Sequence, residues 1–431
     1  MRRLYSFLLF ISLPVIFARL YFKGRLNPMY RQRWKERLAI IPEIKKNNSQ
    51  KLIWIHAVSV GEVEATLPLV KKLFSEYSDL HIIMTTTTPT GAETVARRYP
   101  EQFNKQIKHF YIPYDLTILI NRFIKKINPD LLIILETEVW PNLIHVCDQK
   151  NIPVLLANAR MSKRSAKGYK RFSSLSQPTF SKLNAVAAQT DQDAERIISL
   201  GAIADNVVVS GSLKFDQKLP VDINKRSLEL RKKLGSKRPI WIAASTHEGE
   251  EEKILAAHAE VIKTLTNCLL ILVPRHPERF DHVYNLCEKA GFKTNRRSVE
   301  KNNIQQQSDN QIYMVDTMGD LLLCYGAADV AFVGGSLAEI GGHNLLEPAS
   351  LGIPVIMGPH TFKIEKIFQT FVDENAAVCV NNTGELADKI LKYLENDQKR
   401  FATGKRARDL VERNQGSAQR HIDLIKEQLV N

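Results

Sequence analysis

The strongest constraint on the fold is an alternation of short apolar runs with longer amphipathic stretches. Near-continuous apolar strands that alternate with helices are typical of a parallel sheet covered by helices on both faces. Segments 62–77 and 117–128 have the pattern of such covering helices. In the first half of the chain, the predicted strands are residues 52–57, 81–86, 109–114, 131–136, 153–158, 185–190 and 207–212.

The same alternation of apolar runs and amphipathic stretches is interrupted at residues 213–238 and then resumes. Residues 213–238 are rich in charge and poor in strand-like runs, which indicates a linker and a connecting helix. A chain of 431 residues has room for two domains of this kind. We therefore predict an α/β fold with two Rossmann-like parallel-sheet domains and a cleft between them. The predicted strands of the second domain are residues 239–245, 269–275, 311–316, 329–335, 354–358 and 376–380.

The expected domain boundaries follow from these two series. They are an N-terminal anchor at 1–25, a first domain at 26–217, a linker at 218–238 and a second domain at 239–431, whose final helix could cross back. Residues 301–311, KNNIQQQSDNQ, predict an exposed loop. Ligands of such sheets bind outside the carboxyl ends of the strands, and the conspicuous polar motifs of this chain follow predicted strands.

The N-terminal segment LYSFLLFISLPVIFA (residues 4–18) is apolar and has basic residues on both sides. Residues 1–50 carry eleven Lys or Arg and two Glu, so they supply +9 of the formal charge of +14. We predict an uncleaved membrane anchor, with the rest of the chain on the cytoplasmic face near anionic lipid. The segment is short for a bilayer span of about 20 residues, which leaves a buried or interfacial helix open. A cleaved signal peptide is less favoured because no small-x-small cleavage pattern follows.

Composition argues against several other classes. The five cysteines are scattered without a CxxC pair, so most are expected to be small core residues in a reducing compartment. The histidines of the motifs, at 56, 247, 276 and 343, lack metal-ligand spacing, and no metal is expected. A nucleic-acid binder would place its charge along a groove with interleaved aromatics, whereas here the basic excess sits beside the anchor.

Motifs of the second domain predict a nucleotide site. In VGGSLAEIGGHNLLEP, glycines allow close backbone approach, and Glu347 could accept hydrogen bonds from ribose hydroxyls. Arg275, after a strand, presents a planar fork of donors suited to phosphate. Met318 and Gly319 could lie against a base. The alternatives are a tight turn capped by Asn344 and an ordinary surface arginine.

Motifs of the first domain predict acid–base chemistry. Glu62 follows a strand and the turn Ser59–Gly61, although its place in a first helical turn is also favourable without any function. Glu136 and Glu138 are spaced i, i+2, which would put both on one side of an extended chain, with Lys214 as a partner. The alternative is a structural ion pair. The basic run 158–171, NARMSKRSAKGYKR, could hold a phosphorylated acceptor or form a solvated helix face.

Ten motifs then point to one family. In order, they are SVGE, TTTTPTGAETV, ETEVWPNLI, NARMSKRSAKGY, GSLKFD, STHEGEE, LVPRHPERF, DTMGDL, FVGGSL and GGHNLLEP…MGPHTF. This set resembles the Kdo transferases of lipopolysaccharide biosynthesis, where Kdo is 3-deoxy-D-manno-octulosonic acid. The resemblance implies a GT-B glycosyltransferase fold and inverting transfer of Kdo from CMP-Kdo to the lipid A precursor lipid IVA, without cofactor or metal. It also implies a place at the cytoplasmic face of the inner membrane, among its lipids.

The resemblance also assigns roles to residues. Glu62 would be the catalytic base, and Glu136 and Lys214 would support the transition state. Apart from the resemblance, the basic run suggests Arg160, Lys163 and Arg164 as contacts of the acceptor. CMP would be bound by Pro274, Arg275, Met318, Gly319, Asp320, Asn344, Leu345, Leu346 and Glu347. Many family members have Glu where this chain has Asp320, which puts a side-chain role there in doubt.

Two competing functions remain at this point. One is a GT-B transferase that uses a different nucleotide sugar. The other is a non-catalytic membrane scaffold with a degenerate transferase fold, against which the intact Glu62, Arg275 and Glu347 argue. The motifs leave open how many Kdo residues are added.

Overall fold

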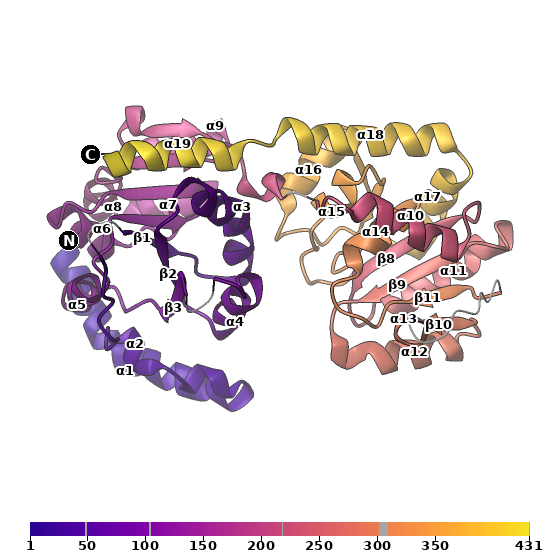
Figure 1. The fold of residues 1–431 in the computed structure, drawn as a ribbon, viewed down its shortest axis with the longest axis horizontal. Helices are drawn as coiled ribbons and strands as arrows, with labels where there is room; N and C mark the ends of the chain where they lie inside the picture. The colour runs from indigo at the N-terminus through magenta and orange to yellow at the C-terminus, as the bar shows by residue number, and fades with distance from the viewer. Residues whose placement is uncertain (48–49, 103–104, 218, 301–308, 431) are drawn as a thin grey trace. The chain divides into compact units, whose positions relative to one another are not determined.

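All thirteen predicted strands form in the computed structural model, which describes residues 1–47, 50–102, 105–217, 219–300 and 309–430. The chain divides into two units, each built on its own sheet (Figure 1). Unit 1 comprises Met1–Gln217 and Asn414–Asn431, and unit 2 comprises Lys218–Arg413. The predicted loop at 301–311 lies outside the described residues for positions 301–308.

The sheet of unit 1 is entirely parallel, with strand order β3-β2-β1-β4-β5-β6-β7. The chain moves outward from β1 to β3 and then returns to the other side of β1 with β4. This reversal makes the carboxyl ends of β1 and β4 the topological switch point, where such sheets bind ligands. The strands are β1 Lys51–His56, β2 Leu80–Thr86, β3 Ile107–Tyr111, β4 Leu131–Leu135, β5 Val154–Ala159, β6 Ala185–Ala188 and β7 Val207–Val209.

Helices cover both faces of this sheet because successive strand side chains point to opposite sides. Ile53 and Ile55 of β1 join one apolar cluster, and Leu52 and Trp54 join the other. The first cluster is covered by α3 (Val60–Glu76), α4 (Pro89–Arg98) and α19 (Ser417–Val430), and the second by α5 (Thr117–Ile127), α6 (Pro141–Gln149), α8 (Ser173–Phe180) and α9 (Asp191–Ile198).

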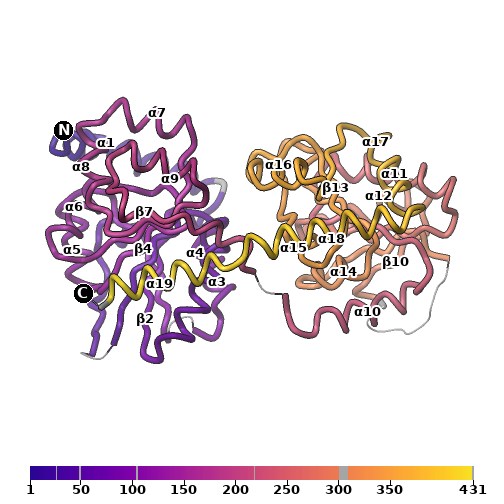
Figure 2. Tube along the Cα trace, turned by 90° about the horizontal axis from the view of Figure 1, so that it is seen from above, coloured from indigo at the N-terminus to yellow at the C-terminus, as the bar shows by residue number. Residues whose placement is uncertain are grey.

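The last helix, α19, is part of unit 1 although it comes from the end of the chain. It lies beside α3 (Figure 2), and its Ile422 and Ile425 are fully buried in the sheet cluster. The buried His421 accepts the backbone N–H of Asn158 at 2.9 Å. Asp216 also accepts the N–H of Gly416 at 2.6 Å. The C-terminal helix therefore supports the carboxyl end of β5 directly.

Unit 2 repeats this arrangement with order β10-β11-β9-β8-β12-β13-β14, again all parallel. The reversal of order here lies between β8 and β12. The pattern of apolar runs missed only β10 among the described strands, because its three residues are polar and half-buried. The strands are β8 Ile240–Thr246, β9 Leu269–Pro274, β10 Thr294–Arg296, β11 Ile312–Met314, β12 Val330–Val333, β13 Val355–Met357 and β14 Ala377–Cys379.

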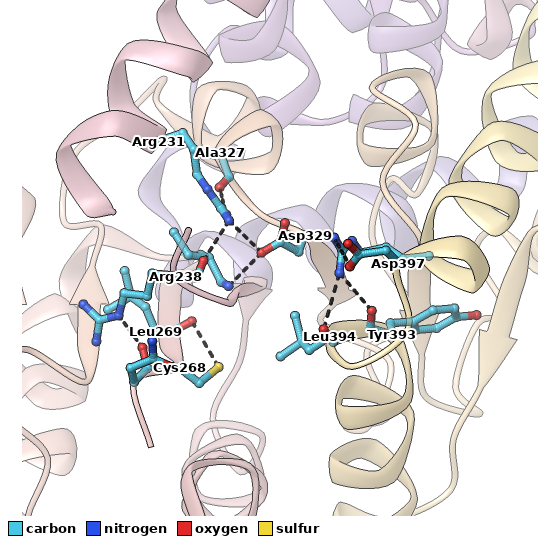
Figure 3. A network of polar contacts seen from close by, with 12 residues as sticks. Arg231, Arg238, Cys268, Leu269, Ala327, Asp329, Tyr393, Leu394 and Asp397 are labelled. Atoms are coloured by element: carbon cyan, nitrogen blue, oxygen red, sulfur yellow. Dashed lines mark hydrogen bonds and ion pairs between the residues drawn. The ribbon is translucent and has the colours of Figure 1, made fainter. Parts of the chain in front are cut away.

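The region predicted as a linker with a connecting helix contains helix α10 (Ile223–Leu234), which is part of unit 2 and packs against α14 (Leu321–Ala327). Arg231 donates to the carbonyls of Ala327 and Arg238 and to the carboxylate of Asp329, at 2.7–3.0 Å (Figure 3). The charge-rich composition hid a short apolar face on α10, whose buried Ile223 and Leu230 join the core. Residue 218 lies outside the described range.

The remaining elements complete the two units. Four of the five cysteines are buried, as expected, and Cys379 is exposed. Among the described helices, α1 alone is long and apolar enough to cross a membrane, by length and composition. The elements are α1 Arg2–Leu26, η1 Pro28–Arg31, α2 Trp34–Arg37, α7 Lys163–Arg171, η2 Ala204–Asn206, η3 Leu213–Asp216, α11 Glu251–Thr264, η4 Pro277–Arg279, α12 Phe280–Lys289, α13 Arg297–Glu300, α15 Leu346–Ser350, α16 Glu365–Asp373, α17 Thr383–Leu394 and α18 Asp397–Arg413.

Candidate active site

Glu62 lies in the first turn of α3, shortly after β1 and next to the switch point of unit 1. The hydroxyl of Ser59 caps the helix and also donates to Glu62 Oε1 at 3.1 Å. The backbone N–H of Val58 donates to Oε2 at 2.8 Å. The carboxylate thus forms an arrangement like a capping box, and its side chain is held in one orientation.

Burial decides the ionisation of Glu62. The residue is only 8% exposed, and burial is the main cause that raises the pKa of its carboxyl to about 8. The hydrogen bonds from Val58 and Ser59 act in the opposite direction, and the nearby carboxylates of Glu136 and Glu138 add to the rise in pKa. The cap therefore orients Glu62, while burial brings its pKa into the range where a carboxylate serves as a general base near neutral pH.

Glu136 and Glu138 follow β4 on the other side of the switch point, but not by the alternation that the sequence suggests. Strand β4 ends at Leu135, and Glu136 adopts a left-handed backbone conformation with φ of +57°. The i, i+2 argument for an extended chain is therefore wrong here. Both carboxylates nevertheless lie close enough to Glu62 to raise its pKa. Burial raises the pKa of Glu138, which accepts the indole N–H of Trp140 at 2.9 Å.

Lys214 lies in η3, and its Nζ is 3.9 Å from Glu136 Oε1. Both side chains keep about a quarter of their surface exposed, at 28% and 21%. An ion pair of this length and exposure contributes little to folding, typically below about 1 kcal/mol. The predicted pairing of Lys214 with Glu136 is present. Because the pair contributes little to stability, a role beyond a structural one is compatible with it.

His56, the last residue of β1, lines the same end of the sheet. Burial lowers the pKa of its imidazole to about 4, so the ring is neutral. Nδ1 is 3.0 Å from the Thr85 hydroxyl, and the ring meets the edge of Trp140 at 5.2 Å. Its buried Nε2 has no hydrogen-bond partner among the described residues. His56 is therefore a neutral, buried ring at this end of the sheet and adds no charge there.

The predicted acceptor residues lie after β5. The backbone N–H of Arg160 donates to the carbonyl of Glu136 at 3.4 Å, so this half-buried arginine is tied to the carboxylate cluster. Lys163 and Arg164 begin α7 and are exposed. The structure brings Arg160 next to the cluster and leaves the other two on the helix surface nearby.

In unit 2, the loop after β8 is tied to the glycine-rich loop after β12 by a carboxylate that the sequence reasoning did not assign. Glu250 is fully buried and accepts the backbone N–H groups of Gly335 at 2.7 Å and His247 at 3.1 Å. Its other oxygen accepts three more, from Ser336, Leu337 and Ala338. The signal available in the sequence was the acidic triplet of STHEGEE after a strand.

Two features let this loop form. Gly334 approaches the end of β8 so closely that a Cβ there would lie 2.7 Å from the Ser245 carbonyl oxygen. Gly335 has φ of +67°, which an L side chain rarely adopts. The glycines therefore allow the turn, and Glu250 holds it in one conformation.

Histidine and arginine side chains gather above this loop. His247 Nε2 is 2.7 Å from His343 Nε2, and the ring of His276 meets that of His247 at 5.2 Å. Burial lowers the pKa of His343 to about 3, and His247 and Arg275 contribute to the same shift. Arg275 is itself exposed after the buried Pro274, at the end of β9. The cluster offers imidazole rings and a guanidinium, which suits an anion.

The remaining predicted nucleotide residues lie at the same edge of the sheet. Met318 is 64% exposed and Gly319 has φ of +90°. The carboxylate of Asp320 bonds Arg297 at 2.7 Å and the Thr317 hydroxyl at 2.5 Å. The side chain of Asp320 therefore holds the loop in place. The backbone at Met318 and Gly319 remains to contact a ligand.

The segment Asn344–Glu347 leads into helix α15. The helix begins at Leu346, and Asn344 Oδ1 accepts the Leu346 N–H at 3.1 Å. Asn344 Nδ2 also donates to Glu347 Oε1 at 3.2 Å. Leu345 and Leu346 are buried, so they hold the segment in place rather than offer side chains to a ligand.

Comparison with known proteins decides the family. Residues 32–217 match the family model described as 3-deoxy-D-manno-octulosonic-acid transferase (kdotransferase), and residues 251–410 match glycosyl transferases group 1. A 3-deoxy-D-manno-octulosonic acid transferase of Haemophilus influenzae is 40% identical over 99% of this chain and 98% of its own length. This chain belongs to the Kdo transferase family.

The Kdo transferase is accordingly a glycosyltransferase of lipopolysaccharide biosynthesis. Its two-sheet fold is shared with the UDP-GlcNAc 2-epimerase of Neisseria meningitidis, with a TM-score of 0.58 and 12% identity over 88% of this chain and all of that one. The C-terminal CMP-Kdo binding domain of WaaA from Acinetobacter baumannii matches 44% of this chain and 99% of its own at 35% identity, with a TM-score of 0.42. The predicted family and the GT-B-like fold class are confirmed.

Proposed function

We propose that this Kdo transferase moves Kdo from CMP-Kdo to lipid IVA by an inverting displacement. The observation that carries the proposal is the buried, oriented Glu62 carboxylate at the switch point of unit 1, with its pKa raised to about 8. A base of this kind can take the proton of an acceptor hydroxyl as that oxygen bonds to the anomeric carbon of Kdo. The bond from that carbon to the CMP phosphate oxygen breaks, and CMP leaves.

Unit 2 is proposed to hold the donor through the loops after β8, β9, β11 and β12. Arg275, His247 and His343 offer donors for the CMP phosphate, and the Met318–Gly319 backbone faces the base. Fixed donors stabilise the charge that develops on the leaving group without reorganising at the moment of reaction. Arg275 is exposed and its group is permanently charged, which supports that role.

Metal independence is part of the proposal. Among the described residues, the structure has no group of three or more His, Cys, Asp or Glu side chains able to hold a metal ion. The guanidinium of Arg275 and the ammonium of Lys363, which both lower the pKa of His343, can instead offset phosphate charge. Turnover in the presence of excess EDTA should match turnover without it; restoration of activity by an added divalent ion would contradict this part.

The donor and acceptor are tested together by the release of CMP. Purified protein given freshly generated CMP-Kdo should release CMP only when lipid IVA is present, and mass spectrometry of the product counts the Kdo residues added. Release of UDP from UDP-sugars instead would favour the alternative, a GT-B transferase for another nucleotide sugar. Lipid IVA without its phosphates provides the matched acceptor control, because Arg160, Lys163 and Arg164 are proposed to bind those phosphates.

Lys214 should act on the transition state through Glu136 and its own charge. We expect Lys214→Met to lower kcat by about 10- to 100-fold, in line with the loss of one electrostatic stabiliser. Thermal stability should stay within about 1 kcal/mol of the wild type, because the 3.9 Å pair is partly exposed. Lys71→Met, an exposed lysine of α3, is the matched control. A large loss of stability with normal kcat would make the pair purely structural.

The location is proposed to be the cytoplasmic face of the inner membrane. Helix α1 is the candidate membrane segment, and the basic residues around it are suited to anionic headgroups. A membrane surface is also where a lipid acceptor with acyl chains resides.

A further inference from the structure

Helix α1 has two different faces from Arg2 to Leu20. Positions three or four residues apart are half-buried, which is the repeat of one helical face. This face is directed at the rest of unit 1, and Figure 1 shows α1 running along the outside of that unit near α5 and α2. The half-buried positions are Arg2, Tyr5, Ser6, Leu9, Ser12, Leu13, Ile16, Phe17 and Leu20.

The first turn of α1 is fixed by a polar network. Arg2 Nη1 donates to Asn142 Oδ1 at 2.9 Å and lies 3.2 Å from the Thr117 hydroxyl. Asn142 Nδ2 donates to the Ser6 hydroxyl at 2.9 Å. Asn142 is fully buried at the start of α6, and its backbone N–H is bound by the buried Asp115. These contacts attach the N-terminal end of α1 to the folded unit.

The far half of α1 is attached to the same unit by aromatic contacts. The ring of Phe17 lies 5.3 Å from that of Trp34 and 5.5 Å from that of Tyr114. Further on, the guanidinium of Arg31 stacks on the ring of Tyr21 at 4.2 Å, and Arg31 Nε donates to the Tyr21 carbonyl at 3.2 Å. Both halves of the helix therefore contact unit 1.

The opposite face of α1 is apolar and open. Its large side chains are each more than half exposed, although a soluble surface seldom carries so many together. Exposed Arg3, Arg19, Lys23 and Arg25 flank them at the two ends. The apolar side chains are Leu4, Phe7, Leu8, Phe10, Ile11, Val15 and Phe22.

From this geometry we infer that α1 lies in the plane of the membrane surface and does not cross the bilayer. Its docked face holds unit 1, its apolar face enters the boundary between headgroups and acyl chains, and its flanking cations meet anionic headgroups. The residues from Arg2 to Phe17 span about 22 Å. A crossing helix would carry one of the two contact sets into a hydrocarbon core of about 30 Å, where the polar network around Asn142 could not remain.

This inference deepens the proposed membrane location, and it is tested without any sugar donor or lipid acceptor. Single cysteines replace Leu4, Ile11 or Phe22 in a Cys379→Ser background, since the other native cysteines are buried. Each full-length variant is labelled with an environment-sensitive fluorophore and bound to vesicles of phosphatidylethanolamine with phosphatidylglycerol. Quenchers placed at known depths then locate each label. Leu13→Cys, on the docked face, is the matched control.

The expected result is one shallow depth for all three exposed positions and little quenching at Leu13→Cys. A deep label at Ile11→Cys with the two others in opposite leaflets would overturn the inference in favour of a span. Absence of vesicle binding together with cross-linked dimers through these positions would also overturn it, because a second copy would then cover the face.

A charge on the open face provides a second measurement. Ile11→Glu should lower the bound fraction on the same vesicles by about tenfold or more, because a carboxylate opposes insertion among acyl chains. Its thermal stability should not change, since Ile11 is 56% exposed. The matched control is Ile203→Glu, at an exposed isoleucine near β7 that should leave binding unchanged. Equal loss of binding in both variants would contradict the assignment of this face.

Discussion

Glu62→Gln should lower transfer by about 10²- to 10⁴-fold, the usual contribution of a general base. The amide cannot accept the hydroxyl proton, while it can still accept the Val58 N–H that holds the side chain in place. Binding of CMP should be unchanged, since the predicted CMP contacts lie in unit 2. In the wild type, the acidic limb of kcat/KM should lie well above pH 4.5 and toward the Glu62 pKa of about 8.

The same substitution should stabilise the fold at alkaline pH. The folded pKa of Glu62 is raised above its unfolded value of 4.5, so the fold favours the protonated carboxyl. That contribution is complete below pH 4.5 and is lost as the pH rises through about 8, where the buried side chain becomes an anion. Glutamine does not ionise. The free energy of unfolding of the variant should therefore exceed that of the wild type by roughly 4 to 5 kcal/mol above pH 8, and the difference should narrow toward pH 5.

Thermal denaturation between pH 5 and pH 9, together with initial rates, checks both parts. Glu64→Gln, two residues further along α3, is the matched control, and its activity and pH profile should follow the wild type. Near-native turnover of Glu62→Gln would remove this residue as the base. A stability gap that does not depend on pH would show that the carboxyl is not the buried acid described here.

Sequence patterns predicted the strands well because each core strand is a continuous apolar run, and such runs have few alternative structures. The apolar pattern was a poor guide where an element of the fold has mostly polar residues. Strand β10 is polar, and the apolar face of α10 comprises few residues among many charges. Neither failure concerns the switch points, so the edge of each sheet that carries the motifs was predicted correctly.

The residues of the site were predicted from the family motifs more than from physical arguments about spacing and charge. The i, i+2 argument placed Glu136 and Glu138 together for the wrong reason, because the left-handed backbone at Glu136 cannot be read from spacing. The high pKa of Glu62 could not be predicted from the sequence either. A position at a helix start suggests a lowered pKa, whereas burial in the folded structure raises the pKa instead. The role of Glu250 depends on five N–H groups, four of which come from a loop about 85 residues away.

Glu250→Gln should weaken donor binding strongly, since this carboxylate organises the loop that is proposed to hold CMP. Its two oxygens accept five backbone N–H groups without exposure to solvent. Glutamine replaces one oxygen with an NH₂ group, which would face donors and leave them unsatisfied. An unsatisfied buried group costs roughly 1–3 kcal/mol, so the variant should lose stability by about that amount. We expect the Kd for CMP to rise by at least about tenfold, which corresponds to about 1.4 kcal/mol.

Titration calorimetry with CMP and steady-state kinetics distinguish loop positioning from a general loss of folding. The KM for the donor should rise more than kcat falls. The acidic limb that reports Glu62 should not move, because the five N–H groups that Glu250 binds all belong to unit 2, whereas Glu62 belongs to unit 1. Glu248→Gln, exposed in the same turn, is the matched control and should bind CMP as the wild type does. Wild-type CMP affinity in a folded Glu250→Gln variant would show that the loop after β12 keeps its conformation without this carboxylate. The nucleotide would then have to be recognised by other groups at this edge of the sheet.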